Sequence, residues 1–393
     1  MLKLLGKFKN RKFFMQSPRI KVSDRVLKWA IKNGECDSDT IKKKYSWVES
    51  GKSPTLIQLK NFSNSTKIPF SYLLLSDPPE ENIELVKFRT CNNANYIPSR
   101  SLIDTINIME SRQEWMNDYR KYNGQDSKID FINSIDLSTL NGNEVPQVAH
   151  DIRKMLKLDD FSHGTDDDFF KYIRKNISNS GVLVMQNGVV ANQTRRHLDV
   201  NEFRAFTLID DISPLIFINN QDSIRAKIFS LVHEFIHLLC GINELLNDDP
   251  SSSMNNHKKE EQIINNLTAK VLMPSNRLKR DYQCIKDIDK ISRKYHVSKI
   301  ALAIELKRLN LITKNVVVNI SQETQDVIKK KKSSGGDYYN TKLSRIDSNF
   351  MYALTDATDS GYTSIDEASY LSCAPNSFNK LKKEFKAREG IPW

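Results

Sequence analysis

The spacing of apolar residues predicts a short helical region, then a small sheet, then two long helices. Apolar side chains recur at helical spacing over residues 22–31 and again over 54–63. Short β-rich runs at 181–185, 203–208 and 215–218 are separated by Asn/Gly, Asp and Ser-Pro, which is typical of strands in a small sheet. Helices are expected over 223–240 and 258–273, the second ended by Pro274.

The remaining segments are read as mostly helical. Residues 98–175, the pair within 285–312 and the tail from Tyr338 favour helices, whereas 316–320 is expected to form a last strand. Pro78 and Pro79 mark a boundary, and the polar stretch 321–337 is expected to be a linker. The predicted division is a basic extension 1–16, a small helical domain 17–79, a helical connector 80–179, a chemistry-bearing domain 180–320, the linker 321–337 and a helical C-terminal region 338–393.

Composition excludes several classes of protein. With 39% hydrophobic and 27% charged residues among 393, the chain is neither fibrous nor disordered, and it is long enough for more than one domain. The net charge is +11, and residues 1–60 carry +10 of it, with 15 Lys/Arg against 5 Asp/Glu. This basic region could bind DNA phosphates or an acidic protein, or it could be a solvated lysine-rich face.

The cysteines and the hydropathy indicate the compartment. Five cysteines lie far apart without CxxC spacing, which argues against both disulfides and a cysteine zinc site. No stretch approaches the ~18 apolar residues of a membrane span, and the first residues lack the pattern of a signal peptide. We therefore expect a cytoplasmic protein with no membrane partner.

One motif carries chemistry. His233 and His237 lie at i and i+4 in the apolar run 228–239, so both imidazoles project from one helix face, as a tetrahedral zinc site needs. Glu234 can take a proton from water and is the natural general base. With 7 His and at most 48 Glu in the chain, about 0.015 such matches are expected by chance. The alternative is two core histidines that hydrogen-bond each other.

A catalytic zinc site needs a third protein ligand. The helix predicted over 258–273 begins with Glu260 and Glu261, and either acid could reach across to the first helix. His257, in the polar loop before it, is a weaker rival. Alternatively, both acids are charges that merely stabilise a helix N-terminus.

Residues 233–237 form the motif His-Glu-x-x-His (HExxH). Together with the segment from Glu261 to Pro274, this motif resembles the ImmA/IrrE family of zinc metallopeptidases in its long form. In that family the third metal-binding glutamate precedes an Asn by four residues, a position that corresponds to Glu261 before Asn265. The resemblance covers most of the chain, including 188–206 and the tail. It implies an α+β fold with a zincin-like core of a small sheet plus zinc-binding helices, flanked by mostly helical regions.

The N-terminal domain resembles the Xre-type helix-turn-helix that often precedes this peptidase, on the segments 47–59, 68–75 and Pro78-Pro79. Only 12 residues separate Gly34 from Trp47, which is too few for a scanning helix, a turn and a recognition helix. The domain is therefore either a degenerate helix-turn-helix whose basic charge binds DNA phosphates nonspecifically, or a unit that still binds specific DNA.

The family resemblance implies a zinc-dependent endopeptidase that cleaves a specific transcriptional repressor or antitoxin-like partner in a phage, mobile-element or stress-response system. The alternative is a non-catalytic DNA- or protein-binding regulator with a structural zinc site. His197, Arg204 and His257 are the candidates for stabilising an oxyanion. Residues 215–218 are expected to pair with an extended substrate backbone.

Overall fold

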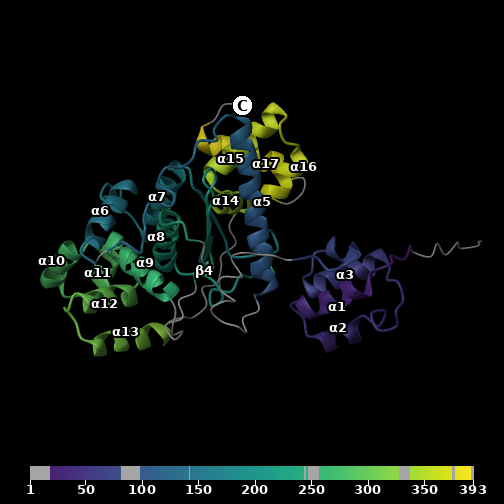
Figure 1. The fold of residues 1–393 in the computed structure, drawn as a ribbon, viewed down its shortest axis with the longest axis horizontal. Helices are drawn as coiled ribbons and strands as arrows, with labels where there is room; N and C mark the ends of the chain where they lie inside the picture. Colours follow the sequence, from purple (N-terminus) through teal and green to yellow (C-terminus); the bar gives the residue numbers. More distant parts are fainter. Residues whose placement is uncertain are drawn as a thin grey trace, which may run out of the picture. The chain divides into compact units, whose positions relative to one another are not determined.

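The computed structural model describes residues 18–80, 98–140, 142–242, 245–246, 256–326, 337–373 and 377–390 (Figure 1). The chain divides into two compact units, of which the first ends at Asn82 and the second begins at Ile83. The basic extension expected at 1–16 lies outside the described residues, as does residue 17.

The first unit is helical and has its own core. Its elements are α1 (Asp24–Asn33), α2 (Ser38–Lys44), α3 (Leu56–Thr66) and the 3-10 turn η1 (Tyr72–Leu74). Thr55 caps α3 by exchanging hydrogen bonds with Gln58, and Phe62 contacts Trp47 in the core. Between Gly34 and Trp47 the structure contains a single helix of seven residues, α2, followed by turns. DNA binding by this unit stays a prediction.

The second unit is built on a sheet in the order β1-β3-β2-β4, formed by β1 (Leu183–Asn187), β2 (Ala205–Leu208), β3 (Leu215–Asn219) and β4 (Leu245–Leu246). β3 is parallel to β1 and antiparallel to β2. Successive side chains enter different cores: Ile216 and Ile218 face one, while Leu215 and Phe217 face the other. Both faces of the sheet are therefore covered, which explains its apolar strands.

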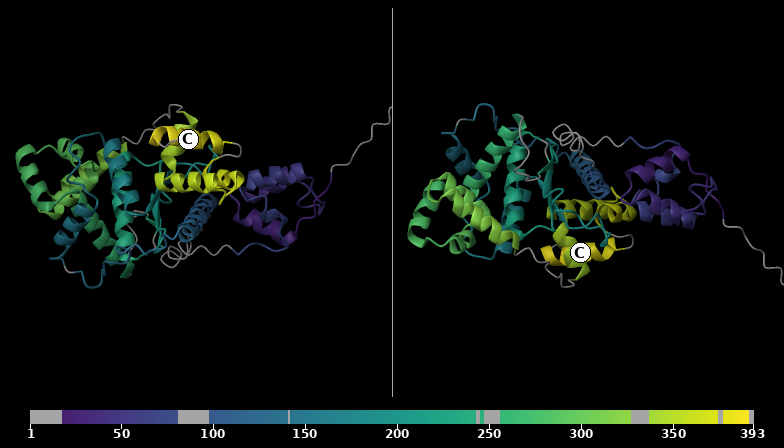
Figure 2. Two further views of the ribbon diagram at one scale, coloured as in Figure 1. Left: turned by 90° about the horizontal axis from the view of Figure 1, so that it is seen from above. Right: turned by 90° about the horizontal axis from the view of Figure 1, so that it is seen from below.

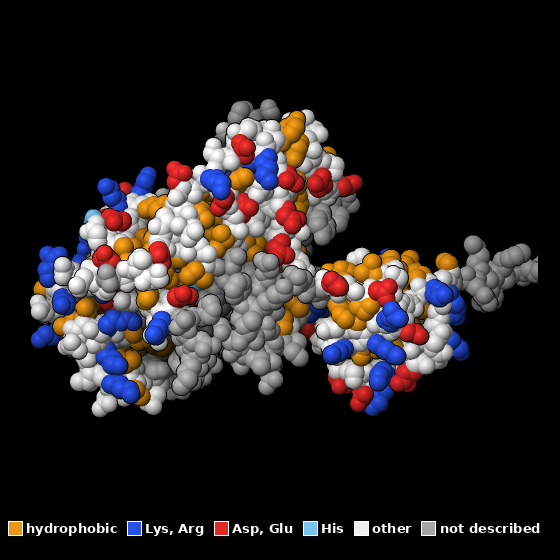
Figure 3. Space-filling model, viewed as in Figure 1, with side chains coloured by type: hydrophobic (Ala, Val, Ile, Leu, Met, Phe, Trp, Pro, Cys, Tyr) orange, Lys and Arg blue, Asp and Glu red, His pale blue; other side chains and the backbone are white. Residues whose placement is uncertain are grey.

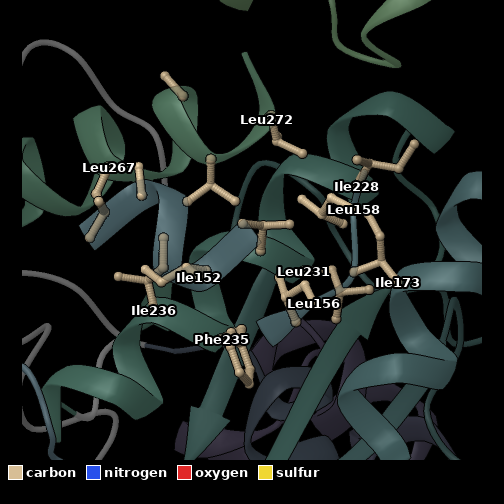
Figure 4. Packing of buried hydrophobic residues seen from close by; sticks show 14 of the residues in the cluster. Ile152, Leu156, Leu158, Ile173, Ile228, Leu231, Phe235, Ile236, Leu267 and Leu272 are labelled. Atoms are coloured by element: carbon tan, nitrogen blue, oxygen red, sulfur yellow. The ribbon is translucent and has the colours of Figure 1, made fainter. Parts of the chain in front are cut away.

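One face of the sheet is covered by the helix that contains the HExxH motif, α8 (Ile224–Cys240), and by the helices around it. These are α6 (Val145–Met155), α7 (Asp166–Asn179), α9 (Asn256–Leu272), α10 (Ser275–Ile285), α11 (Ile288–Lys294) and α12 (Lys299–Arg308). Figure 4 shows their shared core, where Ile152 of α6 and Leu267 of α9 lie near Ile236 of α8. This packing fixes α9 against α8.

The opposite face is covered by α5 (Arg100–Tyr122) together with the tail helices α14 (Tyr338–Arg345), α15 (Ser348–Ser360), α16 (Ile365–Ser372) and α17 (Phe378–Glu389), as Figures 1 and 2 show. Trp115 of α5 stacks on Tyr119 and meets Phe350 of α15 edge-on. The connector and the tail thus share one core with the strands. The boundaries expected at 179/180 and 337/338 do not separate independently packed units.

Two further expectations are corrected. Residues 316–320 form no strand but lie in helix α13 (Lys314–Asp326). Val316, Val317 and Ile320 are shielded while Val318 is 43% exposed, which is the pattern of a helix face, and α13 packs on α12. The helix continues to Asp326, so the first part of the expected linker is helical; 327–336 lie outside the described residues.

Basic side chains over α10, α11 and α12 gather on the face seen in Figure 3. Several of them are neutralised: Lys294 lies 2.8 Å from Asp281, and Lys299 pairs with Asp289. The apolar sides of α11 and α12 enter the core, which favours a structural role for this pair. In the described ranges, no helix is both long enough and apolar enough to cross a bilayer.

Candidate metal and catalytic site

Helix α8 positions the HExxH motif by burying it. The Ser223 side chain caps the first turn by accepting a hydrogen bond from the Ala226 N–H. The helix ends at Gly241, whose φ of 68° is left-handed and whose added Cβ would lie 2.5 Å from Asn133 Oδ1. Every residue from Ser230 to Cys240 is buried, so the motif is surrounded by protein on all sides of the helix.

Three side chains converge beside α8. The Nε2 atoms of His233 and His237 are 2.9 Å apart. Glu261 of α9 brings Oε1 to 3.1 Å from His233 Nε2 and Oε2 to 3.4 Å from His237 Nε2. The two histidines are at most 1% exposed, whereas 26% of the Glu261 side chain is exposed. These residues form the candidate metal triad.

Glu261 is held in its ionised form and in one orientation. Burial raises the pKa of its carboxyl, but the neighbouring His233 and His237 imidazoles lower that pKa by more than burial raises it. The net pKa lies well below the ordinary value. Asn265, one turn along α9, donates a hydrogen bond of 3.0 Å from Nδ2 to Glu261 Oε1. The carboxylate is therefore available as a metal ligand.

Glu234 lies between the two histidines in sequence and is completely buried. Its Oε2 accepts a hydrogen bond of 2.6 Å from the Oγ1 hydroxyl of Thr207, which is also fully buried. Thr207 lies in β2 on the face that meets α8, because Phe206 and Leu208 on either side of it enter the opposite core. The sheet thus supplies a fixed partner for this carboxylate.

The geometry of the triad fits a tetrahedral ion. Ligands at zinc–nitrogen and zinc–oxygen distances stand about 3.3 Å from one another around a tetrahedral centre. The three separations of 2.9, 3.1 and 3.4 Å bracket that spacing. Two imidazoles and one carboxylate also match the donor set of catalytic zinc sites, which keep their fourth position open. In the described part of the chain, this triad brings three potential metal-ligand atoms within 4.8 Å of one another.

The other candidates from the sequence lie elsewhere or are undescribed. Glu260 is not part of the triad, and the side chain of His257 lies outside the described residues. His197 is exposed and its Nδ1 is 3.0 Å from Gln221 Nε2, while Arg204 pairs with Asp222 at 2.6 Å. Neither of these described contacts involves the triad.

The expectation that residues 215–218 pair with a substrate is wrong. They form β3, which is hydrogen-bonded to β1 on one side and to β2 on the other, so its backbone groups are already occupied. A central strand has no open edge to offer to an extended peptide.

Sequence reasoning missed one polar residue of the site. Thr207 lies in an otherwise apolar strand, and an inward-facing hydroxyl at a strand position was the available signal. Asn265 was recognised only as part of the family motif, and the structure shows its contact with Glu261.

Comparison with known families agrees with this site. The family model Peptidase_M78, described as an IrrE N-terminal-like domain, matches residues 177–307. That segment spans β1 to α12 and includes all three residues of the triad, whereas the first unit and the tail helices lie outside it. Searches of curated proteins and of solved structures gave no match. The match supports a metallopeptidase-type function for the second unit.

Proposed function

We propose that this chain is a zinc-dependent endopeptidase with a zincin-like core, in which His233, His237 and Glu261 hold the metal and Glu234 is the general base. When bound, zinc supplies Lewis-acid chemistry, since it polarises a peptide carbonyl and favours ionisation of water at its open position. The family match and the spacing of the triad support this assignment.

The chain's own groups perform the proton transfers in this proposal. Glu234 accepts the proton of the attacking water and delivers it to the leaving amine. Thr207 donates a hydrogen bond of 2.6 Å to one carboxylate oxygen of Glu234, which restricts the orientation of the carboxylate. Asn265 orients Glu261 in the same way. The substrate reaches the site from the side of Glu261, the most exposed member of the triad.

The observation that carries the proposal is the buried Glu234 beside the triad. A structural metal site has no use for an additional carboxylate that is completely buried and tied to a neighbouring strand. Taking a carboxylate out of water is costly, so its presence at this position favours a chemical role.

The proposed substrate is a specific regulatory protein, a repressor or an antitoxin-like partner, rather than proteins in general. This part of the proposal is supported by the resemblance to ImmA/IrrE peptidases. It predicts that few proteins are cleaved, and that a generic substrate such as casein is a poor probe.

Metal analysis tests the site. Zinc per chain is measured in the purified protein after chelator washing and refilling, beside His233→Ala, Glu261→Ala and the matched control Glu260→Ala. About one zinc is expected in the parent and in Glu260→Ala, with loss in the other two variants. A parent chain that binds no zinc would refute the metallopeptidase assignment.

A comparison of protein N-termini tests the activity. Cells that produce the chain are compared with cells carrying Glu234→Gln, and all protein N-termini are identified by mass spectrometry. New termini in a few regulatory proteins are expected only with the unchanged chain, although both proteins bind zinc. If Glu234→Gln keeps zinc and the two sets of termini are identical, the site is structural.

A further inference from the structure

The face of the sheet opposite the metal triad contains buried positive charges without matching acids. Other shielded cations of the second unit have acids or several carbonyls as partners: Arg100 and Arg196 share Asp104 at 2.6 and 2.7 Å, Arg225 lies 2.7 Å from Asp166, and Arg174 donates to three backbone carbonyls. Such pairing is expected, because an isolated buried charge is costly. Among the described residues, three cations around α14 are matched less completely.

This α14 basic cluster consists of Arg112, Lys342 and Arg345. Lys342 is 5% exposed, and its ammonium lies over the ring of Tyr338, at 5.7 Å from the centroid. Arg345 follows one turn later on the same helix, and its Nε is buried with no hydrogen-bond partner among the described residues. Arg112 reaches the cluster from α5.

Among the described residues, the hydrogen bonds of Arg112 go to uncharged groups. Its Nε donates to the Leu371 carbonyl at 2.8 Å, and its NH1 contacts the sulfur of Met185 at 3.7 Å. A carbonyl and a thioether do not neutralise a guanidinium. Across the described ranges, no Asp or Glu forms an ion pair with any of the three cations.

Burial disfavours the charged forms of Lys342 and Arg112, and neighbouring positive charges add to this effect at Lys342. Burial, followed by the positive charges of Arg345 and Arg112, lowers the pKa of Lys342 to about 8. Burial also lowers the pKa of Arg112 to about 10. Arg112 and Arg345 are only half-buried, so the cluster reaches the surface. The Nε of Arg345 has no hydrogen-bond partner among the described residues. Together, Arg345, Lys342 and Arg112 have the composition of a site for a multivalent anion.

We propose that the α14 basic cluster binds the phosphate group of a small molecule, as a ligand site separate from the proposed peptidase site. Two guanidinium groups and one ammonium supply the forked donors and the charge that a phosphate dianion needs. The helices that carry these residues, α14 and α5, pack on the face of the sheet away from α8, so the cluster lies apart from the metal triad.

Binding is tested on the full-length, zinc-loaded chain. The melting temperature is followed against increasing inorganic phosphate, with chloride at matched ionic strength, and isothermal calorimetry measures affinity directly. A nucleoside monophosphate and its parent nucleoside distinguish a free phosphate from a phosphorylated metabolite. A saturable rise with phosphate or with the monophosphate, absent with chloride and with the nucleoside, is expected.

The variants are Lys342→Met and Arg345→Gln, with Lys171→Met on the exposed face of α7 as the matched control. Each cluster variant should weaken phosphate binding about tenfold or more, and the control should not. Lys342→Met should also raise the melting temperature in phosphate-free buffer, because it removes an unneutralised charge. Equal phosphate responses in Lys342→Met and the parent, no response beyond that to chloride, or a lower melting temperature for phosphate-free Lys342→Met would each overturn the proposal.

Discussion

The hydrogen bond from Thr207 to Glu234 should control the proposed reaction. In Thr207→Val the side chain keeps its shape but loses the hydroxyl that lies 2.6 Å from Glu234 Oε2. A hydrogen bond to a charged group contributes about 1.5–3 kcal/mol, and both partners here are completely buried, so no water replaces the donor. If that stabilisation holds the base in its reactive orientation, kcat/KM falls about tenfold to hundredfold. The free energy of unfolding falls by about 1–3 kcal/mol as well.

The assay measures kcat and KM on the substrate identified from the N-terminus comparison, with zinc content determined on the same samples. Thr207→Ser keeps a hydroxyl and should recover most of the rate. Thr268→Val is the matched control, since Thr268 is equally buried but donates to its own helix, to the Ile264 carbonyl at 2.8 Å. We expect the loss in kcat, with KM and zinc content unchanged. Full activity in Thr207→Val would refute the role of Thr207.

Three further changes test other parts of the structure. Asn265→Ala should release Glu261 and weaken zinc binding about tenfold to hundredfold, as measured by chelator competition. Asn266 contacts Arg308, so Asn266→Ala is the control and should leave zinc binding unchanged. Gly241→Ala should lower the free energy of unfolding in urea by at least about 1–2 kcal/mol, because the left-handed backbone disfavours a Cβ; an unchanged midpoint would contradict this. The pKa of Lys342 is lowered to about 8, so between pH 8 and 10 the unfolded chain binds more protons than the folded chain. The stability advantage of Lys342→Met over the parent, up to about 3 kcal/mol, should therefore shrink as the pH of thermal melts rises from 8 to 10.

Local patterns in the sequence predicted the elements that carry the site. The strands at 183–187, 205–208 and 215–219 and the helix at 224–240 lie close to their expected positions, because alternation and helical spacing are properties of neighbouring residues. The failure at 316–320 has the same origin. Three consecutive valines favour a strand by propensity, but packing on α12 selects the helix.

Long-range packing was beyond the sequence pattern. The tail reads as an amphipathic helical region, and nothing in its periodicity states which surface it covers. In the structure, Asp347 at the start of α15 accepts a hydrogen bond from the Val184 N–H of β1, across 163 residues. The sequence pattern did not reveal the α14 basic cluster for the same reason, since its members Arg112 and Lys342 are 230 positions apart in the chain.

Strand β2 links the two halves of the second unit through its alternation. Thr207 faces α8 and Glu234, while its neighbours Phe206 and Leu208 belong to the core shared with α5 and the tail helices. Phe206 stacks on Phe217 of β3, at 5.1 Å between ring centroids. A close-packed core tolerates little change in volume, so a shift of Phe206 moves the backbone that carries Thr207. The tail therefore shares its core with the strand that holds the partner of the proposed base, and we expect substitutions that loosen this core to disturb Thr207.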